Sequence, residues 1–162
     1  IFKESDLIIL SDRIYPYKTS DELNWSIKGI KELVKISLSL NKKILLSDLS
    51  PVFVGNHDPI KSLFLRSIFQ EKDLSDKDIK QKIYQLIPKN FFITNDKIKN
   101  LEKNSDLILF ELFELLCKKT EKECFYQTDK NELIYFDSNH ITLNGAKFLS
   151  TKIDLKKFDL YF

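Results

Sequence analysis

The order of apolar and polar positions is clearest over the first fifty residues. Residues 5–12 (SDLIILSD) and 42–48 (KKILLSD) are short apolar runs bounded by polar residues, and they predict buried strands. Between them, apolar residues recur at helical spacing over 19–38, and Thr19 with Glu22 has the pattern of a capping box. A strand, a long helix and a second strand form a βαβ unit. Such a crossover predicts a parallel sheet with helices on both faces.

Beyond residue 48 the pattern is weaker, but helical and extended segments still alternate. The loop after the second strand, LSPVFVGNHDP (49–59), lies where open α/β sheets place their ligands. Helices are predicted over 60–70, 75–86, 95–104 and 142–153, with Ser75, Asn95 and Thr142 as expected N-caps, and extended segments over 106–110 and 132–137. The alternation predicts a single α/β domain over residues 1–162.

Charge and length narrow the possible function classes. A chain of 162 residues has the size of one domain, and 26 basic against 24 acidic residues leave a formal net charge of only +2. That balance does not provide the basic footprint of a nucleic-acid-binding protein. No apolar run approaches the ~18 residues of a membrane span, and no basic-then-apolar signal segment opens the chain. The sequence has no Met and begins at Ile1, so we expect a piece of a longer protein.

The segment FDSNHITLNGAKFLS (136–150) carries the clearest candidate chemistry. A carboxylate three residues before an imidazole, as in Asp137 and His140, can accept a hydrogen bond from Nδ1–H and leave Nε2 to take a proton from a nucleophile. Gly145 and Ala146 are small enough to let the next helix approach another element closely. The alternative interpretation is that Asp137 only caps a turn and His140 is an ordinary surface histidine.

The two cysteines, Cys117 and Cys124, leave two interpretations open. Their spacing suits a disulfide across a short loop, but two free thiols are equally consistent with it. No zinc site is expected, because His57 and His140 are too few without further ligands. Trp25, like the Phe residues on helical faces, is expected in the core rather than on a sugar-binding platform.

The end of the chain resembles a known family. The phrase YFDSNHITLNGAKFL (135–149) is similar to the last block of the SGNH (GDSL-like) hydrolases, in which Asp-x-x-His supplies the acid and base of a Ser-His-Asp triad. The order of the earlier blocks resembles the extracytoplasmic SGNH domain of acyltransferase-three-type membrane O-acetylases. These blocks are LIILSDRIYPY with Arg13, NKKILLSDLSPV with Pro51, and LLCKKTEKECFYQTDKNELIYFDSNHIT.

The resemblance implies a fold and a set of site residues. The fold would be a flavodoxin-like, three-layer α/β sheet, and its first strand, with the Gly-Asp-Ser block and the nucleophilic serine, would lie upstream of the printed sequence. Asp137 and His140 would be the acid and base. Arg13 would aid substrate or oxyanion binding, or be ion-paired at a strand end. Other expected roles are structural for Ser47 and Ser50 and a solvent-facing turn for Gly55, Asn56 and His57.

The resemblance also implies a function. An acyl group, with acetyl as the expected one, would be transferred to a cell-envelope polysaccharide such as lipopolysaccharide O-antigen, and the fragment alone would be inactive. The implied partners are the glycan acceptor, an acyl donor and an upstream membrane acyltransferase domain; no cofactor is expected. The domain would be periplasmic or extracytoplasmic and tethered to the inner membrane, with Cys117 and Cys124 in a disulfide. Two other functions stay open: a carbohydrate or lipid esterase of the same superfamily, and a non-catalytic glycan-binding or scaffold domain.

Overall fold

The computed structural model describes residues 7–10, 20–54, 74–103 and 107–154, and the chain divides into two compact units. The sheet unit comprises Ile1–Leu49 and Lys89–Leu112, and the hairpin unit comprises Ser50–Pro88 and Phe113–Phe162. The predictions for the Thr19 cap, for Arg13, for the turn at Gly55, Asn56 and His57, and for a helix over 60–70 lie outside the described residues.

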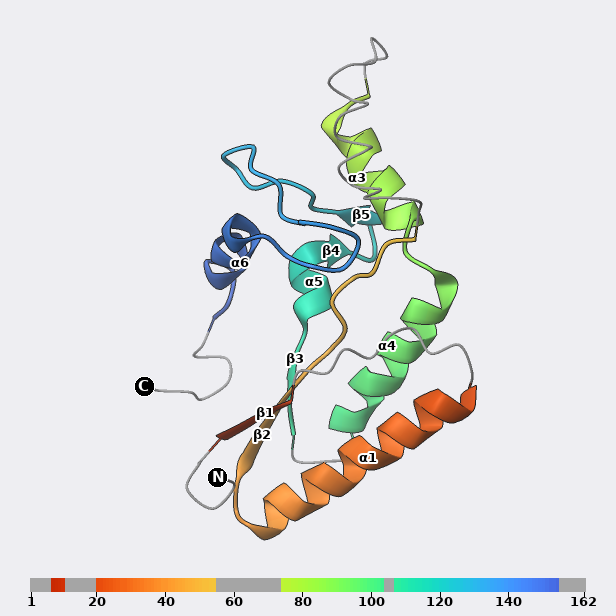
Figure 1. Ribbon diagram of the computed structural model, residues 1–162, viewed down its shortest axis with the longest axis vertical. Helices are drawn as coiled ribbons and strands as arrows, with labels where there is room; N and C mark the ends of the chain where they lie inside the picture. Colours follow the sequence, from red (N-terminus) through yellow and green to blue (C-terminus); the bar gives the residue numbers. More distant parts are fainter. Residues whose placement is uncertain (1–6, 11–19, 55–73, 104–106, 155–162) are drawn as a thin grey trace. The chain divides into compact units, whose positions relative to one another are not determined.

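The sheet unit holds three parallel strands in the order β1-β2-β3 (Figure 1). The strands are β1 (Leu7–Leu10), β2 (Lys43–Ser47) and β3 (Ile108–Phe110). The register pairs Ile8 with Ile44 across β1 and β2. Helix α1 (Ser20–Ser39) contacts β2, helix α4 (Lys89–Glu102) contacts β3, and the two helices contact each other, so they cover one face of the sheet together. The predicted α/β fold with a parallel sheet is therefore confirmed.

Alternation along β2 decides which of its side chains enter the core. Ile44 and Leu46 are 0% and 1% exposed, whereas Lys43 is exposed, because successive side chains of a strand point to opposite faces. On α1 the buried side chains include Ile30 and Val34, four residues apart on one side of the helix. Each aliphatic side chain withdrawn from water in this way stabilises the unit by about 1.5–3 kcal/mol.

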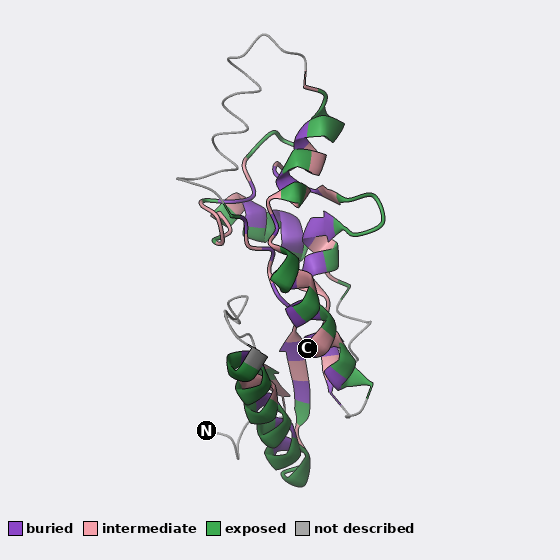
Figure 2. Cartoon of the chain, turned by 90° about the vertical axis from the view of Figure 1, so that its right-hand side faces the viewer, coloured by how far each residue is buried: buried purple, intermediate pink, exposed green. Residues whose placement is uncertain are grey.

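Two predictions for the sheet unit are wrong. Trp25, expected in the core, is 79% exposed, and α1 is exposed over much of its outward surface (Figure 2). Ile9 is 62% exposed, so β1 is not buried on both faces among the described residues. The reason on α1 is a second apolar stripe, in which Trp25 is followed at helical spacing by Leu33, Ile36 and Leu40, all exposed. Hydrophobicity alone does not tell which of two stripes packs.

Helix α4 begins earlier than predicted, at Lys89 directly after Pro88. Asn95, the predicted cap, instead lies buried within the helix. Its Oδ1 accepts a hydrogen bond from the N–H of Leu49 at 2.9 Å, and its Nδ2 donates to Oδ2 of the buried Asp48 at 3.3 Å. The cap prediction is wrong because this asparagine serves a tertiary contact at the end of β2 rather than the start of a helix.

The hairpin unit is built from short elements. They are α3 (Asp76–Gln85), α5 (Leu112–Leu116), β4 (Cys117–Lys118), β5 (Glu123–Cys124) and α6 (Leu143–Ser150). β4 and β5 pair antiparallel, and α3 contacts β5. Ser75 caps α3 as predicted, and Asp78 completes a capping box by accepting from the N–H of Ser75 at 3.0 Å. No helix in the described ranges is long and apolar enough to cross a membrane.

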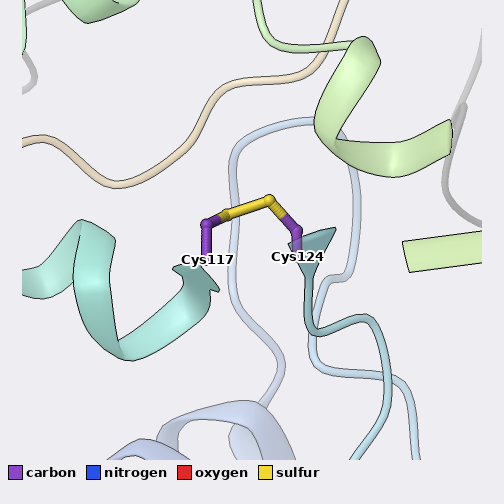
Figure 3. The surroundings of a disulfide bond; sticks show 2 residues. All are labelled: Cys117 and Cys124. Atoms are coloured by element: carbon purple, nitrogen blue, oxygen red, sulfur yellow. A yellow bond between two sulfur atoms is a disulfide. The ribbon is translucent and has the colours of Figure 1, made fainter. Parts of the chain in front are cut away.

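A disulfide joins Cys117 on β4 to Cys124 on β5 (Figure 3). The two residues are register partners, and both are fully buried. Lys122, in the loop between the strands, has a φ of 54°, a left-handed conformation typical of tight turns. Beyond the disulfide the N–H of Phe125 donates to the carbonyl of Leu116 at 2.9 Å. The pairing that the family resemblance implied is confirmed.

The extended segment predicted over 132–137 does not form a strand. Two single bridges stand in its place, Gln127 with Leu133 and Tyr135 with Ile141. The chain turns back directly after Phe136, too soon for a ladder to develop, so this prediction is wrong. Helix α6 follows, capped by Thr142 as predicted, and it ends at Ser150 rather than 153.

Candidate active site

The side chains of Asp137 and His140 are hydrogen bonded to each other. Nδ1 of His140 lies 2.6 Å from Oδ2 of Asp137. A carboxylate accepts but does not donate, so the neutral imidazole carries its proton on Nδ1, and Nε2 is the nitrogen that can accept one. Half of the imidazole side chain is exposed, 50% against 34% for the aspartate. The hydrogen bond predicted from the sequence is confirmed.

The second oxygen of Asp137 fixes the turn that carries the histidine. Oδ1 accepts hydrogen bonds from the N–H groups of Asn139 at 2.9 Å and His140 at 2.8 Å. The carboxylate is therefore both the cap of a turn and the hydrogen-bond partner of the ring. Burial alone would raise the pKa of Asp137, but the hydrogen bonds from Asn139 and His140 outweigh it and hold that pKa below its ordinary value.

The turn is closed at its base by main-chain hydrogen bonds. The N–H of Phe136, the residue before Asp137, donates to the carbonyl of His140 at 2.8 Å. Thr142 then anchors the start of α6, because its Oγ1 donates to the carbonyl of Leu133 at 2.7 Å and accepts from the N–H of Gly145 at 2.9 Å. The pair thus stands between a closed turn and a capped helix.

Gly145 lets α6 approach the segment before the turn. A Cβ at this position would overlap the carbonyl oxygen of Ile134 and lie 2.6 Å from Cγ2 of Ile141. No side chain fits there without moving main chain, so the expectation of a close approach is confirmed for Gly145. It is wrong for Ala146, which is exposed.

Phe53 supports the turn from a segment that the sequence analysis did not connect with it. Its N–H donates to the carbonyl of Ser138 at 2.9 Å. Its ring meets the ring of the buried Tyr135 edge-on, with centroids 4.9 Å apart and an angle of 81° between the planes. The segment after β2 therefore reaches the Asp137–His140 turn. A main-chain donor has no sequence signature, so residue types gave no signal for this contact.

The other predicted site residues have no described role in this turn. Oγ of Ser47 donates to the carbonyl of Asp48 at 2.9 Å, and the buried Oγ of Ser50 has no hydrogen-bond partner among the residues that the structure describes. The structural roles assigned to these serines stay predictions, as do those of Arg13 and the turn at 55–57. Among the described residues, no three His, Cys, Asp or Glu side chains are grouped as they would be around a metal ion.

Comparisons with known proteins show the family and the fold of the chain. Residues 2–154 match the family model described as SGNH domain (fused to AT3 domains). The periplasmic domain of a lipopolysaccharide acetyltransferase from Salmonella ser. Paratyphi A shares the fold, with a TM-score of 0.72 at 13% sequence identity. That likeness covers 94% of this chain and 57% of the solved chain, so this chain spans little more than half of that length. No curated protein matches the chain. Because the family model covers nearly all of it, the chain belongs to the family of SGNH domains that are fused to AT3 (acyltransferase-three) domains.

Proposed function

We propose that the chain is part of an SGNH domain that transfers an acyl group, specifically acetyl, to a cell-envelope polysaccharide. The chemistry is that of a Ser-His-Asp triad in which His140 is the base and Asp137 its acidic partner. The serine comes from a segment upstream of the printed sequence. The observation that carries the proposal is the 2.6 Å hydrogen bond between His140 Nδ1 and Asp137 Oδ2, because it makes Nε2 the basic nitrogen.

The first half of the reaction forms an acyl-serine. Nε2 of His140 takes the proton of the serine hydroxyl while the serine oxygen attacks the carbonyl carbon of the acyl donor. The tetrahedral intermediate collapses, the bond to the leaving group breaks, and the imidazolium gives its proton to that group. Asp137 stabilises the imidazolium, and its lowered pKa keeps it ionised while it does so.

The second half passes the acyl group to the acceptor. A hydroxyl of the glycan gives its proton to Nε2, its oxygen attacks the acyl-serine carbonyl, and the serine leaves and regains a proton from His140. Water in the place of the sugar gives hydrolysis with the same residues. The half-exposed imidazole is accessible to a large acceptor as well as to water.

Location and partners are supported by the family and by the disulfide. The matched SGNH domains are fused to AT3 domains, which supports a membrane acyltransferase domain as donor partner and as tether to the inner membrane. The solved domain of the same fold is periplasmic and comes from a lipopolysaccharide acetyltransferase, which supports an envelope glycan as acceptor. The buried disulfide between Cys117 and Cys124 supports an oxidising compartment.

The upstream serine strand would have a defined place in the sheet. In a flavodoxin-like order the first strand lies between the second and the third. On this proposal β1 and β2 are the second and third strands, and they pair directly here, with Ile9 opposite Leu45. A serine strand placed between them in the complete domain would therefore replace the direct pairing of β1 with β2.

The test is an assay of the full-length parent protein with 4-nitrophenyl acetate. His140→Ala is expected to lower kcat/KM by at least about 10³-fold, because the serine loses its base. Glu121→Ala is the control. This exposed carboxylate lies in the loop between β4 and β5 and pairs with Lys118 on β4, and its removal should leave the rate unchanged. Equal rates in His140→Ala and the parent would contradict the proposal. With an envelope polysaccharide added, acetylated glycan indicates transfer, and free acetate alone indicates hydrolysis.

A further inference from the structure

A second feature of the hairpin unit is an open cavity beside α6, lined by both polar and apolar atoms and here called the α6 cavity. Its volume is about 300 Å³, at the lower end of the range in which proteins bind small molecules, so it suits a ligand of one ring or two. One wall is the turn that carries Asp129, Lys130 and Glu132, and the other is α6 with Asn144 and Lys147.

The charged side chains around the α6 cavity are equal in number for the two signs. Asp129 and Glu132 supply two carboxylates, Lys130 and Lys147 two ammonium groups, and Asn144 an amide. Within the described part of the chain, none of these five side chains makes a hydrogen bond or an ion pair. Equal numbers of the two charges disfavour a small anion or cation. Mixed donors and acceptors suit a neutral ligand with several hydroxyl groups, each of which both donates and accepts.

Both walls of the α6 cavity are held in place by local hydrogen bonds. Oγ1 of Thr128 accepts from the N–H groups of Lys130 at 3.2 Å and Glu132 at 3.3 Å, and the N–H of Thr128 donates to the carbonyl of Glu132 at 2.8 Å. On the other side, α6 is fixed by the Thr142 cap and by the close approach at Gly145. Walls that are already ordered cost a ligand less entropy on binding.

An apolar patch completes the lining. The ring of Phe148 lines the cavity, is largely buried, and lies edge-on to Phe125 with centroids 6.0 Å apart. The ammonium of Lys152 lies 4.6 Å from the Phe148 centroid and fixes the ring further. Because only 9% of Phe148 is exposed and Lys152 lies over its ring, it offers a ligand a small apolar contact rather than a stacking face. A sugar ring offers both a C–H face and hydroxyl groups.

We propose that the α6 cavity is a saccharide subsite that holds one sugar of the acceptor glycan beside the Asp137–His140 pair. The inference rests on the proposed function for its acceptor role. Asn144 on the cavity wall follows His140 by four residues, and four residues of extended chain span at most about 14 Å. The separation of Asn144 and His140 along the chain is therefore no more than a few sugar units would span.

Binding is tested by titrating the ¹⁵N-labelled complete SGNH domain, with its upstream serine strand included, with methyl glucoside, methyl galactoside and N-acetylglucosamine, followed by amide chemical shifts. At least one of these probes is expected to bind with a Kd on the order of millimolar, as single sugars do. The shifted amides should lie at 128–132 and along α6. Inorganic phosphate serves as a charged probe in a parallel titration, and no response is expected.

Two variants address the two walls separately. Asp129→Ala with Glu132→Ala removes both carboxylates and is expected to weaken sugar binding by about 10-fold or more. Lys147→Ala on the opposite wall should weaken it by about 5-fold. All three residues are exposed, so the rest of the spectrum should be retained. Glu121→Ala, an exposed carboxylate in the hairpin loop, is the matched control and should bind like the parent.

Several outcomes would overturn the inference: no shifts with any of the three sugars, shifts confined to residues away from the cavity, unchanged binding in both wall variants, or a response to phosphate alone. Its failure is distinct from failure of the proposed function. If His140→Ala abolishes ester cleavage in the full-length protein while the sugars leave the cavity amides unmoved, only the subsite is lost. If sugars bind at the cavity but His140→Ala cleaves the ester as fast as the parent, only the catalytic proposal is lost.

Discussion

The sheet unit and the hairpin unit are held together in different ways. In the sheet unit, three paired strands and two long helices bury aliphatic side chains such as Ile44 and Leu46. In the hairpin unit the elements are short, and the chain is fixed by a disulfide, by caps and by side chains that bond to main chain, as at Thr142. The candidate catalytic pair lies in the second kind of structure. The side chains of Asp137 and His140 are oriented by hydrogen bonds within their own turn, not by strand pairing in a sheet.

The difference between the two units can be tested with substitutions that destabilise one unit at a time. Hydrogen exchange resolved by peptide reports which unit loses protection. The expected loss of stability is largest for truncation of a core side chain and smallest for removal of a single titrating group.

The largest loss is expected from Ile44→Ala in the central strand of the sheet unit. Ile44 is fully buried, so the change removes transfer energy and leaves a cavity, and stability should fall by about 2–5 kcal/mol in denaturant unfolding. Peptides from β2 and α1 should lose protection most. Ile36→Ala, at an exposed position of α1, is the matched control and should change stability by no more than about 0.5 kcal/mol. Equal loss of protection in the peptides of the hairpin unit would erase the distinction between the units.

A smaller loss is expected from removal of the disulfide in the hairpin unit. Cys117→Ala with Cys124→Ala frees a short loop in the unfolded chain and should cost about 2–3 kcal/mol. The loss should appear in exchange of the peptides around β4 and β5. A reducing agent should destabilise the parent by a similar amount and leave the double variant unchanged; equal sensitivity of both proteins to the reductant would contradict this assignment.

A pair of glycines on helices in the two units should respond with opposite signs. Gly145→Ala forces a methyl group against the carbonyl of Ile134 and should cost about 1–3 kcal/mol. Gly29→Ala on α1 meets no atom within 4 Å and should gain about 0.5–1 kcal/mol through helix propensity. Thermal melting of the two variants beside the parent checks both signs. A more stable Gly145→Ala variant would show that α6 does not press on Ile134.

The smallest effect concerns the acid dependence of the Asp137 turn. The pKa of Asp137 is lower in the folded protein than its ordinary value, so its contribution to stability is present above about pH 4 and is lost as the pH falls through the folded-state pKa. Asp137→Asn removes this term. The difference in Tm between parent and variant should therefore be largest near pH 6 and shrink towards pH 3. A difference that grows on acidification would reverse the sign argued here.

The strands and the long helix of the sheet unit could be predicted because the spacing of their apolar residues matches the positions that are buried. The apolar runs around Ile8 and Ile44 marked β1 and β2, and the helical spacing through Ile30 and Val34 marked α1. The exposed position of Trp25 could not be predicted, because α1 has two apolar stripes and only the tertiary structure selects one.

The candidate site could be predicted only where its chemistry is local in sequence. Asp137 and His140 are three residues apart, so a motif identified them and their hydrogen bond. The extended segment expected over 132–137 forms only two single bridges. The alternation of apolar and polar residues does not reveal that the Asp137 carboxylate will cap a turn there. The contact between Phe53 and Ser138 was also missed, because it joins distant segments through main-chain atoms.

That contact shapes how the molecule tolerates change. The donor is the N–H of residue 53, and every amino acid except proline provides one. A substitution that shortens this side chain would keep the hydrogen bond to Ser138 but would lose the packing of the buried ring on Tyr135. Proline would remove this N–H donor and leave the carbonyl of Ser138 without it, in the loop that carries His140. Position 53 is therefore constrained twice: its main chain must supply an N–H to Ser138, and its side chain, which is 3% exposed, must fill the core beside Tyr135.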